Sequence, residues 1–481
     1  MLSAVVVGAG FSGICAGVQL RKAGIEDFVI LEKAARVGGT WRENTYPGAA
    51  CDIPSHLYSY SFEPNPRWSR AYGKQAEILA YLERVADDFG LRPHMRFDTA
   101  VSAATFDEAT GAWRVTTSAG ELVARALVLG NGALHVPQLP DIPGLASFAG
   151  TQFHSARWNH DYDLAGKRVA VIGTGASAIQ FVPEIAPRVK RLTVFQRTPP
   201  WIVPKRDREM SAVERWAFAR VPGALRARRT GLYWLMESRV IGFAYAPKAF
   251  ELIEPLILAN LARQVPDREL RAKLTPDYRF GCKRVLISND YYRAMGRDNV
   301  ELVTDPIATV EPRGVRTADG ALHEVDAIIC GTGFRVTEYL SSVKIVGRGG
   351  VTLDDAWRTS LRNYLGIAIS GFPNLFLLMG PNTGLGHNSM IFMIEAQARY
   401  AASALATLRD RALAYIDVRP EIERAFRAEL ARKMKGTVWT TGCSSWYQTP
   451  NGEVFLWPAA TVDYWWRTRR LDLADYEQHA A

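Results

Sequence analysis

Three glycines near the start of the chain are spaced for contact with phosphate groups. In the segment VVVGAGFSG, Gly8, Gly10 and Gly13 follow an apolar run and precede a helical pattern. In this spacing the first glycine allows a tight turn of the backbone, and the second lets a pyrophosphate come close to the backbone. The third allows the helix to pack closely against the strand. Glu32 ends the next apolar run, where an acid accepts hydrogen bonds from ribose hydroxyls. These residues predict a dinucleotide site.

A second glycine-rich loop repeats this plan further along the chain. Its residues are Gly173, Thr174, Gly175, Ala176, Ser177 and Ala178, and alanine takes the place of the third glycine. The strand that follows ends in Gln196, Arg197 and Thr198. An acid there would repel a 2′-phosphate, whereas the planar fork of Arg197 can bind one. We therefore expect NADPH at this loop.

Two dinucleotide sites in one chain predict hydride transfer between two cofactors, most economically from NADPH to a flavin. No CxxC pair is present to receive electrons afterwards, so we expect oxygen to be the acceptor and a disulfide reductase to be excluded. The cysteines are odd in number and widely spaced, which predicts reduced thiols and no metal site. They are Cys15, Cys51, Cys282, Cys330 and Cys443.

The composition is that of an ordinary globular protein of two or three domains, with 481 residues, 48% hydrophobic and 22% charged. The net charge is +9, but the basic residues are scattered. We therefore expect a solvated surface and anionic cofactors rather than nucleic acid. No signal segment or membrane span is recognisable, so a cytoplasmic location is expected, with no obligate protein partner evident.

Several motifs resemble those of class B flavoprotein monooxygenases. The segment GGTWRENTYPGAACD (38–52) matches the pattern GGxW, four residues, YPG, three residues, D. FQRTPPW and GPNTGLGHNS are also similar, and GTGF (331–334) has glycine where the family has alanine. A further stretch resembles the fingerprint of the Baeyer–Villiger branch and departs from it at Asn159. Its matching residues are Phe148, Gly150, His154 and Trp158.

The resemblance implies an α/β fold with two Rossmann-like domains that bind FAD and NADP. We expect the FAD domain over 1–147 and 334–481 and the NADP domain over 160–209 and 279–333. The fingerprint linker is expected at 148–159 and a helical insertion at 210–278. For the amphipathic stretches of the insertion we favour core packing over a role at a membrane surface. The insertion and the loops near 439–446 are expected to shape the substrate pocket.

The resemblance also implies an activity: a C4a-peroxyflavin inserts one oxygen of O₂ beside a ketone carbonyl, giving an ester or lactone. The alternative is a relative that oxidises nitrogen or sulfur, which Trp158 and Arg284 disfavour. An alternative of another class is a flavin-binding protein that functions in sensing or assembly. Product formation that accompanies NADPH consumption would exclude it.

By resemblance, Arg284 keeps the peroxide deprotonated and Asp52 orients Arg284; the adjacent Lys283 stays an open alternative. His154 and Trp158 fasten the linker, with a catalytic base as the other reading of His154. His387 either lies near the flavin or caps a helix.

The cofactor contacts expected from the loops and the resemblance form two sets. For FAD they are Gly8, Gly10, Phe11, Ser12, Gly13, Glu32, Lys33, Gly39, Thr40, Trp41, Asp52, Tyr58, Val101 and Met390. For NADPH they are residues Gly173 to Ala178, Gln180, Arg197 and Thr198.

Overall fold

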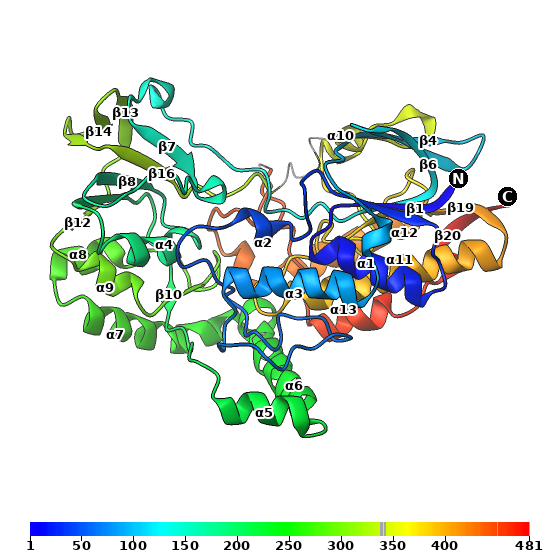
Figure 1. Cartoon of the computed structure of the whole chain (residues 1–481), viewed down its shortest axis with the longest axis horizontal. Helices are drawn as coiled ribbons and strands as arrows, with labels where there is room; N and C mark the ends of the chain where they lie inside the picture. Colours follow the sequence, from blue (N-terminus) through cyan, green and yellow to red (C-terminus); the bar gives the residue numbers. More distant parts are fainter. Residues whose placement is uncertain (337–339, 341–342, 450, 481) are drawn as a thin grey trace.

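The chain forms two large β-sheets, one mixed and one parallel, that lie side by side and are each flanked by helices (Figure 1). The structure is a computed structural model that describes residues 1–336, 340, 343–449 and 451–480. Both termini lie at the first sheet, at the right of Figure 1. The expected α/β architecture with two nucleotide-binding units is therefore present.

The first sheet combines strands from the two ends of the chain. Strand β1 (Leu2–Val7) lies between β2 (Phe28–Leu31) and β6 (Gly120–Leu129), and all three are parallel. All of β2 and the last four residues of β1 and of β6 are buried and apolar, as expected for strand ends covered on both faces. The remaining strands are β3 (Met95–Arg96), β4 (Val101–Asp107), β5 (Ala112–Thr117), β17 (Lys344–Val346) and β18 (Leu375–Leu377).

Helices from distant parts of the chain pack on this sheet. Helix α1 (Phe11–Lys22) contacts both α3 (Gln75–Asp88) and α11 (Met390–Asp410). The C-terminal third thus returns to the first unit. It also contains α10 (Leu353–Trp357), β19 (Leu413–Val418), α12 (Pro420–Met434), α13 (Thr461–Thr468) and β20 (Tyr476–Ala480).

The second sheet is wholly parallel, in the order β12-β9-β8-β16-β7. Its strands are β7 (Thr151–His154), β8 (Arg168–Ile172), β9 (Arg191–Phe195), β12 (Val300–Val303) and β16 (Ala327–Cys330). The fingerprint segment 148–159 therefore supplies an edge strand as well as a connection. Around this sheet lie α4 (Ala178–Ile185), α9 (Tyr291–Met295), the pair β10 (Ile202–Val203) and β11 (Leu286–Ile287), and the small sheet β13 (Ile307–Glu311), β14 (Gly314–Thr317) and β15 (Leu322–Glu324).

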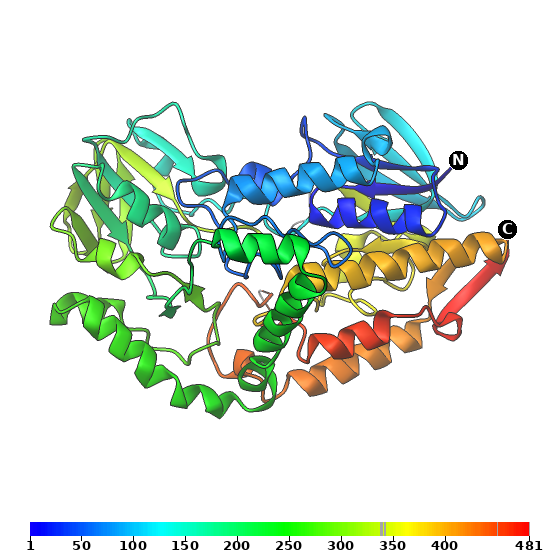
Figure 2. The ribbon, with the colours of Figure 1, turned by 60° about the horizontal axis from the view of Figure 1, so that its bottom comes forward.

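A run of helices lies below the two sheets in Figure 1 and comes forward in Figure 2. It comprises α5 (Ala212–Arg220), α6 (Ala224–Glu237), a π-helical turn (Ile241–Tyr245), a 3-10 helix (Pro247–Leu252), α7 (Glu254–Gln264) and α8 (Arg268–Leu274). Phe243 and Phe250 are buried, but Trp216 and Leu252 are exposed. Core packing therefore accounts for only one side of these helices. Within the described residues, no helix has the length and apolar character needed to cross a bilayer.

Candidate active site

The first glycine loop has a shape that only glycine permits. Gly8 has φ +95°, and a Cβ on it would lie 2.7 Å from the carbonyl oxygen of Gly130. A Cβ on Gly13 would collide with the carbonyl oxygen of Gly8. Helix α1 then begins after Gly10 with no described side chain capping it. Its first backbone N–H groups are thus suited to the phosphates of a dinucleotide.

Glu32 lies at the end of β2, against the glycine loop. Its carboxylate accepts hydrogen bonds from the backbone N–H of Ala9 at 2.9 Å and of Ala34 at 3.1 Å. Arg42 forms an ion pair with it at 3.2 Å. The acid is therefore held in one orientation at the position where a ribose is expected. The sequence analysis did not name Arg42 as a site residue. The only sign in the sequence that it could be one is its position in the GGTWRE segment.

Aromatic side chains expected to line FAD meet beside the same loop. Trp41 lies on the short helix α2 (Thr40–Glu43) and donates from Nε1 to the hydroxyl of Tyr58 at 3.1 Å. The ring of Phe11 lies edge-on to that of Tyr58, with centroids 5.1 Å apart. Met390 begins α11, Val101 begins β4, and Lys33 is exposed after β2. Phe11, Trp41 and Tyr58 thus form one wall, and contact of any of these six residues with a flavin stays a prediction.

The second loop repeats the backbone geometry of the first. Gly173 has φ +102°, and a Cβ there would lie 2.7 Å from the carbonyl oxygen of Gly331. Arg197 is exposed after β9, and Thr198 accepts a hydrogen bond from Thr174. Lys283 comes close to Arg197: burial and this neighbouring cation both lower the pKa of Lys283. Two cations therefore lie where a 2′-phosphate is expected.

Gln180, which is expected to contact NADPH, also connects the two domains. Its side-chain oxygen accepts from the hydroxyl of Tyr46 at 2.9 Å, and its nitrogen donates to the carbonyl of Ala50 at 2.9 Å. A Cβ on Gly48 would lie 2.7 Å from the backbone oxygen of Gln180. The YPG motif (46–48) therefore allows α4 to approach the first domain.

The fingerprint residues are packed into the second domain. Phe148 is buried, and a Cβ on Gly150 would meet its ring and the carbonyl of Asp326. Trp158 contacts Phe181 of α4, with ring centroids 5.3 Å apart. Asn159 accepts a hydrogen bond from the backbone N–H of Asp161, which gives the departure from the family pattern a role as a turn cap.

His154 is buried at the end of β7, beside the GTGF turn. Its Nδ1 accepts from the backbone N–H of Ala156 at 3.1 Å, and its ring lies edge-on to Phe334. Burial lowers the pKa of His154 to about 4, so the ring is neutral at physiological pH. Nearby, Arg157 pairs with Glu43 of the first domain at 3.2 Å. This arrangement suits a residue that fastens the linker.

Arg284 and Asp52 form an ion pair across the two domains. Burial alone would raise the pKa of Asp52, but Arg284 outweighs it and holds that pKa below its ordinary value. Asp52 in turn raises the pKa of Arg284. The side chains are 34% and 28% exposed, so part of this pair stays open to a small molecule. The guanidinium of Arg284 thus carries a permanent positive charge that Asp52 holds in one orientation.

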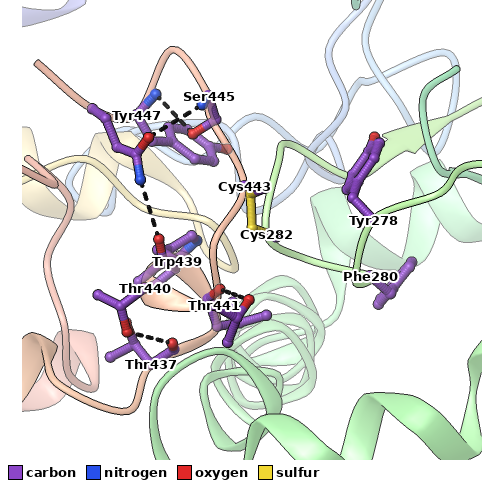
Figure 3. Close-up of a disulfide and its surroundings, with 12 residues drawn as sticks. Tyr278, Phe280, Cys282, Thr437, Trp439, Thr440, Thr441, Cys443, Ser445 and Tyr447 are labelled. Atoms are coloured by element: carbon purple, nitrogen blue, oxygen red, sulfur yellow. Dashed lines mark hydrogen bonds between the residues drawn. A yellow bond between two sulfur atoms is a disulfide. The ribbon is translucent and has the colours of Figure 1, made fainter. Parts of the chain in front are cut away.

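One prediction about the cysteines is wrong. Cys282 and Cys443 form a disulfide, with Cα atoms 6.2 Å apart (Figure 3), while Cys15, Cys51 and Cys330 are free and buried. The two partners are 161 residues apart, so their spacing gave no sign that folding brings them together. Fully reduced thiols were one reason to expect a cytoplasmic location, and the disulfide removes that reason.

His387 lies in a wholly buried position before α11. Its Nε2 is 3.5 Å from the carboxylate of Glu237 on α6. Glu237 also accepts from Asn388 at 2.6 Å and from the backbone N–H of Thr461 at 2.5 Å. Glu237 thus joins the GLGHNS loop, the insertion and α13. Ser389, rather than His387, caps α11.

Comparison with known proteins agrees with this geometry. The family described as pyridine nucleotide-disulphide oxidoreductase matches residues 5–229. A Baeyer-Villiger monooxygenase of Streptomyces coelicolor is 48% identical over 475 residues, covering 98% of this chain and 92% of the relative. One of Pseudomonas aeruginosa is 46% identical over 475 residues, covering 98% and 90%.

Solved structures give the same result. A steroid monooxygenase bound to NADP superposes with a TM-score of 0.89 at 34% identity, covering 100% of this chain and 99% of the other. A cyclohexanone monooxygenase from Rhodococcus sp. Phi1, bound to NADP⁺, gives a TM-score of 0.89 at 32% identity, with the same coverage. With two dinucleotide loops, the fingerprint and relatives of this similarity over nearly their whole length, the chain belongs to the Baeyer–Villiger monooxygenase family.

Proposed function

We propose that this chain uses NADPH and dioxygen to insert one oxygen atom beside a ketone carbonyl, which gives an ester or a lactone. The proposal rests chiefly on the ion pair between Arg284 and Asp52, which holds a permanent cation where the two domains meet. Its substrate class is a small ketone, consistent with a partly open site between domains.

The residues present fit both cofactors. The loop of Gly8, Gly10 and Gly13 leaves room for a pyrophosphate, and Phe11, Trp41 and Tyr58 offer an apolar wall to a flavin. Gly173 and Gly175 shape the NADPH loop, with Arg197 and Lys283 taking the 2′-phosphate. Once bound, FAD supplies the redox chemistry that side chains lack: it accepts a hydride from NADPH and reacts with dioxygen.

Arg284 supplies the electrostatic part of the reaction. Its guanidinium cannot lose its proton at working pH, so it keeps the attacking oxygen negative and stabilises charge that develops on the carbonyl oxygen. Asp52 holds the guanidinium in place through a charge-assisted hydrogen bond. This assignment leaves Lys283 to the 2′-phosphate, because its neighbour is Arg197.

The test follows NADPH oxidation by the purified flavoprotein with cyclic, linear and aryl ketones and one sulfide. Ester, sulfoxide and hydrogen peroxide are measured against NADPH consumed. Ester in near-stoichiometric yield supports the proposal. Sulfoxide from the sulfide with no ester from any ketone would replace it with heteroatom oxidation, and NADPH oxidation that yields only peroxide with the whole panel would count against oxygen insertion.

A further inference from the structure

The disulfide joins two segments that reach the active site from opposite ends of the chain. Cys282 belongs to the segment 278–284, which ends at Arg284, and Cys443 belongs to the loop 437–447, which ends at Tyr447. Figure 3 shows the sulfur bridge between these two segments, with Tyr278 and Phe280 on one side and Trp439 and Thr441 on the other. The bond is thus two residues from the arginine that the proposed reaction needs.

Both segments bring a residue close to the ion pair between Arg284 and Asp52: one carries Arg284 itself, and the other carries Tyr447. Tyr447 is buried, and burial raises its pKa to about 12, while Arg284 acts on that pKa in the opposite direction. Asp52 raises the same pKa, so Tyr447 lies within electrostatic reach of both partners. A shift of the loop 437–447 would therefore change the surroundings of the Arg284–Asp52 pair.

The described hydrogen bonds of the loop 437–447 do not reach the segment 278–284. The hydroxyl groups of Thr437, Thr440 and Thr441 donate to backbone carbonyls within 434–438, so they stabilise the loop internally. Throughout the described part of the chain, no hydrogen bond links residues 278–284 to residues 437–447. What remains is apolar packing around Phe280 and Trp439, together with the disulfide.

We propose that the Cys282–Cys443 disulfide is a positioning element for Arg284. It clamps the loop 437–447 onto the segment that carries the arginine, and so determines what share of the oxygen enters product rather than leaving as hydrogen peroxide. This role rests on the proposed function of Arg284. It makes the two cysteines positioning residues, because neither of them needs to touch substrate.

The bond is open to chemical reduction from one side. Cys282 is 1% exposed, whereas Cys443 is partly exposed, so we expect a thiolate to attack the sulfur of Cys443 rather than that of Cys282. Attack by a small dithiol forms a mixed disulfide with Cys443 and releases Cys282 as a thiolate, which takes up a proton. The second thiol of the reductant then releases Cys443 as a thiol and closes the oxidised, cyclic reagent. Two electrons and two protons pass from the dithiol to the protein.

The first experiment measures structure rather than activity. The FAD-loaded protein is reduced with dithiothreitol and desalted without oxygen, and mass spectrometry of alkylated peptides counts the thiols. Hydrogen exchange is then compared with that of the oxidised protein. We expect faster exchange in 280–286 and 437–447 and unchanged exchange in 8–22. Free Cys282 and Cys443 in the untreated protein, or equal exchange in the two forms, would overturn the proposal.

The second experiment measures how oxygen is partitioned. Per bound flavin, we expect the reduced protein and the variant Cys282→Ser/Cys443→Ser to release several-fold more peroxide per NADPH with a ketone present. The rate of flavin reduction should be unchanged at saturating NADPH, where a weaker contact of Lys283 with the 2′-phosphate has no effect. Simple loss of folded protein would lower all rates in proportion and leave this ratio unchanged. Dithiothreitol should have no further effect on the double variant, which is the matched control.

The outcomes separate the two proposals. If the wild-type protein makes no ester, the proposed function fails, but the exchange data still report whether the bond clamps the two segments. If ester forms and the peroxide ratio is the same with and without the bond, the positioning role is refuted. If the double variant does not fold, the comparison of oxidised and reduced wild-type protein carries the test.

Discussion

Arg284 and Asp52 form an ion pair although 232 positions separate them in the sequence. Asp52 follows the YPG segment of the first domain, whereas Arg284 follows the helical insertion and belongs to the second. The position of this cation therefore depends on the relative placement of the two domains. Any change at the domain junction should affect oxygen insertion more than cofactor binding.

Replacement of Arg284 by Met should remove oxygen insertion and leave both cofactor sites intact. We expect ester formation to fall by about 10²- to 10³-fold, the usual loss when one electrostatic stabiliser of a transition state is removed. NADPH oxidation should continue with release of peroxide. Arg284→Lys is the matched control, which keeps the charge without the planar fork and should retain more activity. A Met variant with normal ester yield would remove Arg284 from the mechanism.

Arg197 and Lys283 should together select NADPH over NADH. Loss of a charged hydrogen bond to the 2′-phosphate costs about 1.5–3 kcal/mol. We therefore expect Arg197→Ala and Lys283→Ala each to reduce the ratio of kcat/KM for NADPH to that for NADH by about tenfold or more. Activity with NADH should change little. An unchanged ratio in both variants would place the 2′-phosphate elsewhere.

Gly48→Ala should destabilise the contact between the domains. The residue has φ +79°, and a Cβ would lie 2.7 Å from the backbone oxygen of Gln180. We expect a loss of about 1–3 kcal/mol from strain and overpacking, seen as a lower Tm. Gly166→Ala is the control, since its φ is +69° and nothing lies within 4 Å of its Cβ. Equal losses in the two variants would show that α4 does not press on the YPG segment.

His154 should make stability depend on pH. Burial lowers its pKa from 6.5 to about 4 in the folded protein. Between these values the unfolded chain binds a proton that the folded chain does not, so stability falls as the pH decreases from 6.5 to 4 and is unaffected above that range. His154→Asn should make this slope in Tm smaller and still bind FAD, and the rest of the slope should persist because burial also lowers the pKa of His56 to about 4. A slope that is unchanged in the His154 variant would contradict the buried, neutral ring, and a variant purified without FAD would contradict a linker role.

The sequence predicted the two dinucleotide loops because each is a local structure. Gly8 and Gly173 both need positive φ at the end of a strand, and the residues that impose this lie within a few positions of each other. The aliphatic runs of β1 and β8 predict buried parallel strands for the same reason. The comparisons confirm the fold and family that these motifs indicated.

Contacts between residues far apart in the sequence were harder to predict from residue spacing. Gln180 has the spacing of a loop residue, yet its side chain bonds Tyr46, 134 positions away. Sequence reasoning left Lys283 as an alternative to Arg284, and its closeness to Arg197 supports the role at the 2′-phosphate proposed above. The roles of such side chains are decided by which neighbours the packing supplies.

By itself, the sequence determined the fold class, the two cofactor loops and the family, because each depends on short patterns whose geometry is enforced locally. The family resemblance also led us to expect the pairing of Asp52 with Arg284. Only the tertiary structure decided that Gln180 joins the domains and that Cys282 bonds Cys443. Those contacts arise where the two domains pack together and bring segments from distant parts of the chain to one place. Residue spacing carries no information about that docking, since it depends on the summed packing of many apolar side chains.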